Sequence, residues 1–190
     1  MKKRILVFTL FCIISIFPFI ALAGTNDKPE GRAPENGDNP FTLEAPQNLT
    51  AELKYDQDNV PYFELKLDIP QSVKDIDAKL VENSEYFKGK SCSPVVIQID
   101  YKYANYDWNE GPSLYWDTST YLEGFLDDGG VYNYRPFQDV DDAGAVNIKE
   151  EVYSFRAYFY SDWGYEGDWI DFRVVSDYSN IATVGNTAYY

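Results

Sequence analysis

Histidine is absent from the 190-residue sequence, and cysteine occurs only twice. Without histidine the chain can form neither a serine–histidine nor a cysteine–histidine nucleophile, and it cannot bind zinc through imidazole. Cys12 lies in an apolar N-terminal run, so after removal of that run Cys92 has no partner for an intrachain disulfide. Stability must therefore come from buried side chains.

Basic residues are also scarce, with 16 Lys and Arg against 31 Asp and Glu and a formal net charge of −15. A chain this acidic repels phosphate backbones and anionic lipid head groups. The charge argues against nucleic-acid partners and against electrostatic docking on a membrane, and it favours attraction to cations.

The N-terminal segment "MKKRILVFTLFCIISIFPFIALAG" has the features of an export signal. Positive charges precede an apolar run over residues 5–20, and Ala21-Leu22-Ala23 provides a small-x-small cleavage motif. We therefore predict a signal peptide over residues 1–23 that is cleaved after Ala23, and an extracellular or cell-surface location. An uncleaved membrane anchor is the alternative.

The segment that follows, residues 24–42, reads "GTNDKPEGRAPENGDNPFT" and has almost no apolar side chains. Such a segment cannot offset its ordering entropy by burial, so we expect a flexible leader. The folded domain is expected over residues 43–190.

The rest of the sequence is rich in apolar residues that alternate with polar ones, and we find no helical period in it. Four segments of this kind predict an all-β fold with two antiparallel sheets around one core. The residues expected to face the core are Leu49, Ala51, Leu53 and Tyr55; Phe63, Leu65, Leu67 and Ile69; Val95, Ile97, Ile99, Tyr101 and Tyr103; and Tyr153, Phe155, Ala157 and Phe159.

Five segments resemble the fibronectin type III domain of bacterial secreted and cell-surface proteins. "APQNLTAEL" at residues 45–53 resembles its opening, and "SDYSNIATV" at residues 176–184 resembles its last strand. "YFELKLDIP", "IQIDYKYANYDW" and "VYSFRAY" resemble the second, third and sixth strands. The resemblance implies an immunoglobulin-like antiparallel β-sandwich. It also places Tyr153 at the tyrosine corner, where the hydroxyl bonds to backbone a few residues upstream.

The resembling span, residues 43–185, is longer than the roughly 100 residues that such a domain needs. The excess falls at residues 71–94, 106–130 and 161–172, which we interpret as inserted loops. Loops at the ends of a sandwich commonly carry binding sites, although these could equally be inert.

An acidic segment, "DVDDAGAVNIKE" at residues 139–150, nearly fits the calcium-loop pattern D-x-[DN]-x-[DN]-G-x5-E. Ala143 removes one oxygen ligand, so a solvated acidic turn is the alternative to a calcium site. No other cofactor is expected. The candidate ligands are Asp139, Asp141, Asp142 and Glu150.

Aromatic residues gather in the predicted insertions. Flat exposed rings beside carboxylates can bind sugars, and exposed Tyr and Trp also suit a protein-binding surface. The same rings could instead cover an open end of the domain. The candidates for ligand binding are Trp108, Trp116, Trp163, Tyr165 and Trp169.

These features predict a secreted, non-catalytic binding, adhesion or structural module whose partner is an extracellular protein or a glycan. Self-association through sheet edges is a further option. The alternative function is a small extracellular carbohydrate-binding or carbohydrate-active protein, for which only a pair of carboxylates could supply catalysis.

Overall fold

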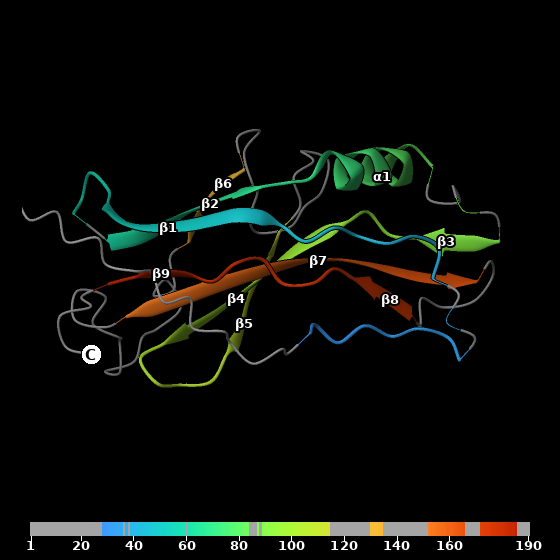
Figure 1. The fold of residues 1–190 in the computed structure, drawn as a ribbon. Coiled ribbons are helices and arrows are strands. Elements are labelled where there is room, and N and C mark those ends of the chain that lie inside the picture. The colour runs from blue at the N-terminus through green and yellow to red at the C-terminus, as the bar shows by residue number, and fades with distance from the viewer. Residues whose placement is uncertain are drawn as a thin grey trace, which may run out of the picture.

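The computed structural model describes residues 28–35, 37, 39–59, 61–83, 87, 89–114, 130–134, 152–165 and 172–185. This part of the chain is mostly antiparallel β-sheet with one helix (Figure 1). Within it, no helix combines the length and the apolar character that a membrane crossing requires. The elements are β1 (Gln47–Tyr55), β2 (Pro61–Asp68), α1 (Gln71–Glu82), β3 (Lys90–Cys92), β4 (Val96–Tyr103), β5 (Asn109–Leu114), β6 (Val131–Tyr134), β7 (Tyr153–Tyr165), β8 (Phe172–Val175) and β9 (Ala182–Val184).

The first sheet has three strands in the order β1-β2-β6. Both pairings are antiparallel, and β2 lies in the middle. Leu49, Phe63, Leu65 and Leu67 are buried in this sheet, whereas the polar residues between them are exposed or only partly buried. The predicted alternation is therefore confirmed for β2 and only in part for β1, where Ala51 and Leu53 are partly buried and Tyr55 is 42% exposed.

The second sheet has six strands around β7. One edge of β7 pairs with β4 over residues 153–160 and then with β3 over residues 163–165. The other edge pairs with β9 over residues 153–155 and with β8 over residues 160–163. Strand β5 extends the sheet on the far edge of β4. The 13 residues of β7 thus pair directly with four other strands, β3, β4, β8 and β9.

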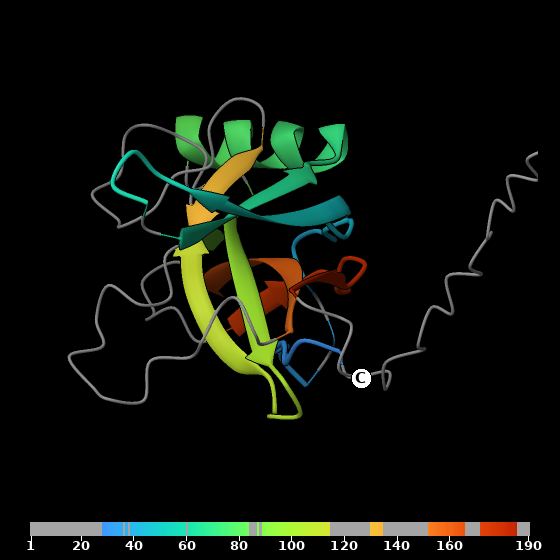
Figure 2. The same ribbon diagram turned by 90° about the vertical axis from the view of Figure 1, so that its left-hand side faces the viewer.

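The core lies between the two sheets, which form separate layers (Figure 2). The ring of Phe63 on β2 lies 4.8 Å from that of Tyr153 and 5.0 Å from that of Phe155, both on β7. All three side chains are at most 1% exposed. These contacts join the layers, and alternate residues of β4 and β7 fill the space beside them.

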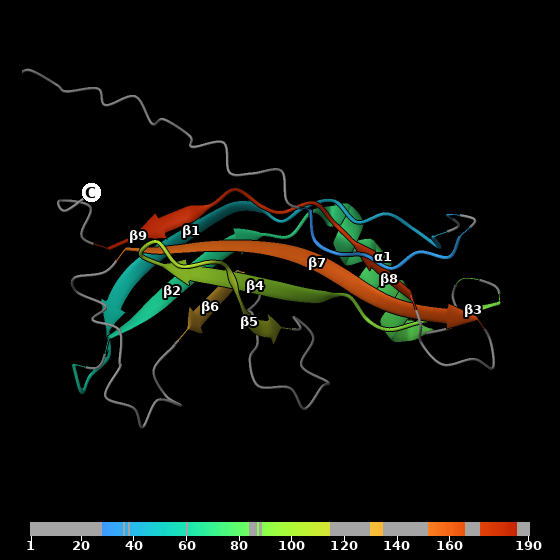
Figure 3. The same cartoon turned by 90° about the horizontal axis from the view of Figure 1, so that it is seen from below.

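A helix occupies part of the segment that the sequence analysis treated as an inserted loop without helical period. In α1, Val73, Asp77 and Leu80 are buried on one face, with the i, i+4, i+7 spacing of a helix. Only two of the 12 helical residues are buried apolar ones, so the helical pattern in the sequence is weak, which explains the wrong prediction. Figures 1 and 3 show α1 over the half of β7 that the three-stranded sheet leaves uncovered.

The segment at residues 161–172, also expected to be an inserted loop, is strand for its first five residues, because β7 continues to Tyr165. Trp163, expected as an exposed ring, is 0% exposed and belongs to the core. Its ring packs 4.7 Å from the ring of Phe172 on β8. The prediction for Trp163 as an exposed ring is therefore wrong, because its alternation places it with Phe159 on the inner face of a longer strand.

Part of the expected leader lies against β8 (blue in Figures 1 and 3). The N–H of Arg32 donates to the carbonyl of Arg173 at 3.1 Å, and the N–H of Arg173 donates back at 2.7 Å. Pro29 is buried, and Lys28 pairs with Asp177 at 2.9 Å. The expectation of a flexible leader rested on the lack of apolar side chains, and that criterion overlooks main-chain pairing.

Tyr153 is buried, as a tyrosine-corner residue should be, with 1% of its surface exposed. Its ring lies 5.9 Å from that of Tyr103 on the neighbouring strand. The upstream backbone that its hydroxyl would contact falls in residues 135–151, outside the described residues. The corner itself therefore stays a prediction.

Candidate functional site

The surface of the six-stranded sheet that faces away from the core carries an unusual group of charged and aromatic side chains. We call this surface the outer face. Its centre is Asp100 on β4, which lies directly opposite Arg156 on β7 in the strand register. Asp100 is only 5% exposed, although it points away from the apolar core. Other side chains on the same face therefore cover it.

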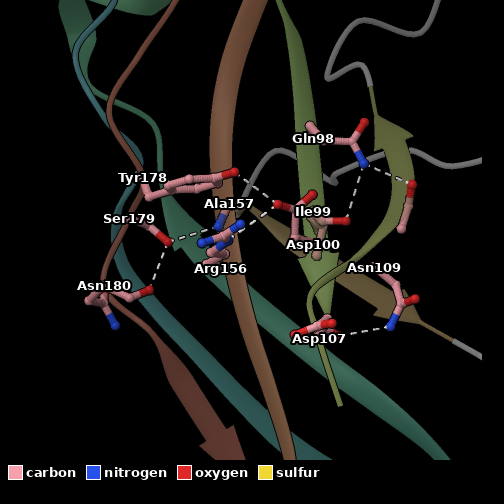
Figure 4. A network of polar contacts seen from close by, with 11 residues as sticks. Gln98, Ile99, Asp100, Asp107, Asn109, Arg156, Ala157, Tyr178, Ser179 and Asn180 are labelled. Carbon is pink, nitrogen blue, oxygen red and sulfur yellow. Dashed lines mark hydrogen bonds and ion pairs between the residues drawn. The ribbon is translucent and has the colours of Figure 1, made fainter. Parts of the chain in front are cut away.

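Two residues hold the Asp100 carboxylate (Figure 4). Arg156 Nε donates to Oδ2 at 3.2 Å, and the hydroxyl of Tyr178 donates to the same oxygen at 3.1 Å. The second oxygen, Oδ1, is buried and has no hydrogen-bond partner among the described residues. The side chain of Arg156 is 12% exposed and that of Asp100 8%. This is a buried ion pair, and removing one member of such a pair is strongly destabilising because the other charge stays buried without a partner.

Rings and cations alternate around this ion pair. The guanidinium of Arg156 lies over the ring of Trp108, 4.3 Å from its centroid, and over the ring of Tyr178, 3.7 Å from its centroid. Lys102 Nζ lies 5.0 Å from the centroid of Trp108. We call Lys102, Trp108, Arg156 and Tyr178 the cation–ring stack. Cations over ring faces are favourable, more so when desolvated.

A second, similar group continues toward β8. Arg173 lies over the ring of Tyr160, 4.1 Å from its centroid, and donates to both carboxylate oxygens of Asp162 at 2.6 and 2.9 Å. Tyr158 connects the two groups, since its ring lies 5.3 Å from Tyr178 and 6.2 Å from Tyr160. The outer face is therefore one continuous set of ring contacts from β5 to β8.

The motif Ser176-Asp177-Tyr178-Ser179-Asn180 sets the position of Tyr178 between β8 and β9. Ser176 accepts from the N–H of Phe159 through its hydroxyl at 2.9 Å and donates its own N–H to the carbonyl of Phe159 at 2.9 Å. Ser179 does the same with Ala157, at 3.0 and 2.8 Å. Each serine thus satisfies the backbone of one β7 residue without a regular strand. Tyr178, between them, projects over Arg156 (Figure 4).

Asn180, at the end of this motif, connects the two sheets. Its Oδ1 accepts from the N–H of Leu49 at 2.9 Å, and its Nδ2 donates to the carbonyl of Leu49 at 2.8 Å. Leu49 is 2% exposed, so its backbone groups have little access to water. The side chain of Asn180 replaces a backbone partner for β1.

Changing Asn180 to Ala is expected to lower the free energy of unfolding by about 1–3 kcal/mol, because a buried donor and acceptor lose their partner. Asn180→Asp keeps an acceptor for the N–H of Leu49 but loses the donor, so its effect should be intermediate. Urea unfolding followed by circular dichroism measures both. Equal stability of all three chains would contradict the contact.

Burial raises the pKa of the Asp100 carboxyl above its ordinary value. The positive charge of Arg156 and the hydrogen bonds from Tyr178 and Arg156 oppose this rise, and the nearby Glu110 adds to it. Burial, with the negative charge of Asp100, also raises the pKa of Tyr158 to about 12. Burial further raises the pKa of Tyr178. Both phenols therefore stay protonated at neutral pH, so Tyr178 remains a donor to Asp100.

A raised pKa in the folded state means that the folded chain binds a proton more readily than the unfolded chain. Asp100 therefore contributes stability that grows as the pH falls through its folded pKa and that is lost as the pH rises above it. Thermal melts from pH 7 down to pH 4 should show the wild-type chain gaining stability relative to Asp100→Asn. A difference between the two chains that does not change with pH would contradict the raised pKa.

The structure places the predicted ligand-binding residues in three different situations. Trp108 belongs to the cation–ring stack. Trp163 is a core residue, and Tyr165, 39% exposed, lies at the end of β7 with its ring 5.7 Å from that of Trp163. Trp116 and Trp169 lie outside the described residues, as do the candidate calcium ligands Asp139, Asp141, Asp142 and Glu150. Among the described residues, no group of three or more acidic or cysteine side chains is arranged to hold a metal ion.

The residues at the centre of the outer face were not among the site residues predicted from the sequence. Asp100 and Arg156 are both on the water-facing side of predicted strands, and opposite charges there are ordinary. Only the register of β4 against β7 shows that they are direct cross-strand partners. In the fibronectin type III resemblance these two segments are the third and sixth strands. Pairing those strands in the sequence could have brought Asp100 opposite Arg156.

Comparisons of the chain with protein-family models, with curated proteins and with solved structures find no match. The candidate site is therefore defined by its geometry.

Proposed function

We propose that the protein is a secreted, non-catalytic binding module on a fibronectin type III-like β-sandwich, and that it binds a protein partner through the outer face. The strand order supports the fold. In immunoglobulin-type sandwiches strands A, B and E share one sheet and C, F and G the other. Here the corresponding orders are β1-β2-β6 and β4-β7 followed by β8 and β9. The helix α1 then occupies the connection between the second and third strands.

The predicted signal peptide supports the proposed location outside the cytoplasm. This signal peptide, residues 1–23, would deliver the chain to an oxidising environment. The free Cys92 is buried there and is poorly placed to react. Burial raises the pKa of the Cys92 thiol to about 11, so little of it is the reactive thiolate at neutral pH.

The covered ring faces favour a protein partner over a glycan. A sugar ring stacks on an uncovered aromatic face, but Trp108, Tyr178 and Tyr160 each have a cation over the ring. These cations leave less open ring face for a sugar and add guanidinium groups to the surface. Tyr, Trp and Arg held in a fixed arrangement are the residues that dominate the binding energy of protein interfaces.

The chemistry of Asp100 supports a binding role rather than catalysis. Its carboxylate is buried and already engaged by Arg156 and Tyr178. A general acid or base of a glycoside hydrolase must instead reach the scissile bond.

Saturation binding of the labelled, purified chain to cells that secrete the protein tests the proposal. Trp108→Ala and Tyr160→Ala are expected to weaken saturable binding at least about tenfold, as expected for hot-spot residues. Lys66→Ala, which removes an exposed partner of Glu64 on the other sheet, is the matched control and should bind like wild type. Circular dichroism of each variant shows whether the fold is retained.

Pretreatment of the same cells separates the two classes of partner. Protease treatment should abolish saturable binding, whereas periodate oxidation of glycans should leave it unchanged. The reverse result would contradict a protein partner and favour the carbohydrate-binding alternative. Equal binding by wild type and both ring variants would contradict the outer face as the binding surface.

A further inference from the structure

The outer edge of β8 is bound by a segment from the beginning of the described chain, although the two are far apart in sequence. Arg32 and Arg173 exchange two backbone hydrogen bonds in an antiparallel bridge. We call residues 28–32 the N-terminal strap. Among the described residues, only Arg32 is hydrogen-bonded to this edge of β8. This edge of β8, which we call the acceptor edge, therefore binds an extended segment of the chain.

The acceptor edge is selective for the sequence of the strap. A Cβ atom at Gly31 would lie 3.1 Å from Val175 Cγ2 and 3.2 Å from the carbonyl oxygen of Arg173. A side chain at this position would crowd the Val175 side chain and the Arg173 carbonyl, which would have to shift by a few tenths of an ångström. Pro29 is buried next to it, and Lys28 Nζ lies 2.9 Å from Asp177 Oδ1. Lys28, Pro29 and Gly31 of the strap thus contribute in three different ways: through an ion pair, through burial, and through close packing on β8.

The attachment is weak for a structural element. Among the described residues it consists of one bridge, the contacts of Pro29 and Gly31, and an ion pair whose side chains are 77% and 68% exposed. Ion pairs this exposed contribute little to stability. None of the described hydrogen bonds between β8 and β7 involves the strap.

The chain that follows the strap is long enough to reach a neighbouring molecule. Phe41 packs on Phe87, with 5.0 Å between the ring centroids, and Leu43 is buried, so the chain is fixed again from there onward. Residues 33–40 lie between the two anchors. Eight extended residues span up to about 26 Å.

We propose that the β8 edge binds the N-terminal strap of a second copy of this chain, so that neighbouring molecules exchange straps. A strap from another copy makes the same contacts as the chain's own strap, so the two arrangements differ only in effective concentration. A short flexible connection gives an intramolecular effective concentration in the millimolar range. Exchange therefore occurs when the molecules are crowded, as on a densely covered surface, and the dilute protein keeps its own strap.

Disulfide trapping in the full chain tests strap exchange. Arg32→Cys with Arg173→Cys places two cysteines at a hydrogen-bonded antiparallel pair, where the Cα atoms are about 5.5 Å apart. After oxidation at about 10 μM protein we expect an intrachain disulfide, and at about 1 mM a substantial fraction of disulfide-linked dimers and longer chains. Non-reducing electrophoresis separates the products. Each single cysteine variant controls for random cross-linking and for the remaining Cys92.

Three results would overturn the proposal. An intrachain disulfide alone at both concentrations would show that the strap does not exchange. The absence of any disulfide would show that the strap does not occupy β8 at all. The third result concerns Gly31→Val in the same double-cysteine chain. It should reduce the linked dimers severalfold, because the added side chain meets Val175 and the Arg173 carbonyl. An unchanged yield of dimers would mean that they form elsewhere.

Discussion

Replacing Trp163 with Ala is expected to lower the free energy of unfolding by about 3–5 kcal/mol, the range for large aromatic residues in a core. Trp163 is 0% exposed and packs against Phe172 on β8. Its loss would leave a cavity where β3 and β8 meet the end of β7. Chemical unfolding of the purified variant measures the change.

The same position offers a graded control. Trp163→Phe keeps an aromatic ring and removes a buried Nε1–H that has no acceptor among the described residues. It should therefore cost much less than Trp163→Ala. Tyr106→Ala, at a ring that is 62% exposed, should change stability little. If Trp163→Ala were as mild as Tyr106→Ala, Trp163 would be a surface ring, as the sequence alone suggested.

Asp100→Ala is expected to cost about 3–5 kcal/mol, because it leaves the buried guanidinium of Arg156 without its counter-charge. The hydroxyl of Tyr178 loses its acceptor in the same step. Arg156→Met should also destabilise the chain, since it leaves the carboxylate buried and removes the cation from the rings of Trp108 and Tyr178.

The double variant separates the ion pair from the packing around it. If Asp100 and Arg156 act as one unit, the double variant should cost clearly less than the two single changes combined. Lys66→Ala, at an exposed ion pair on the other sheet, should change stability little. Additive effects of the two changes, each small, would show that the pair is not coupled.

The sequence predicted the β-strands well where a strand has one apolar and one polar side. The inward sets of β2 and β7, such as Phe63 and Phe155, are buried as their alternation predicts. The prediction failed where that signal was weak. Helix α1 buries only two apolar residues and an acid, and Asp77 is buried because its Oδ1 accepts the N–H of Val95 at 2.7 Å. No periodicity of apolar residues reports such a contact.

The candidate site was harder to predict than the fold. It depends on the register of β4 against β7 and on the hydrogen bonds of residues 176–180, which position Tyr178. Trp108 was selected from its residue type, but Arg156 lies on a strand whose pairing the sequence did not specify, and Tyr178 lies in the motif between β8 and β9. For Trp163 the sequence left open an exposed ring and a ring that covers the domain, and its burial agrees with the second alternative. Residue type alone therefore separates neither core rings from surface rings nor a buried ion pair from an exposed one.

Two tyrosines on the same strand provide the most direct test of the outer face as the binding surface. Tyr160 belongs to the outer face, whereas Tyr165, selected from the sequence alone, lies at the far end of β7. The dissociation constants of Tyr160→Ala and Tyr165→Ala chains for the secreting cells should differ. We predict at least a tenfold loss of affinity for Tyr160→Ala and wild-type affinity for Tyr165→Ala. Loss with Tyr165→Ala and none with Tyr160→Ala would contradict the account.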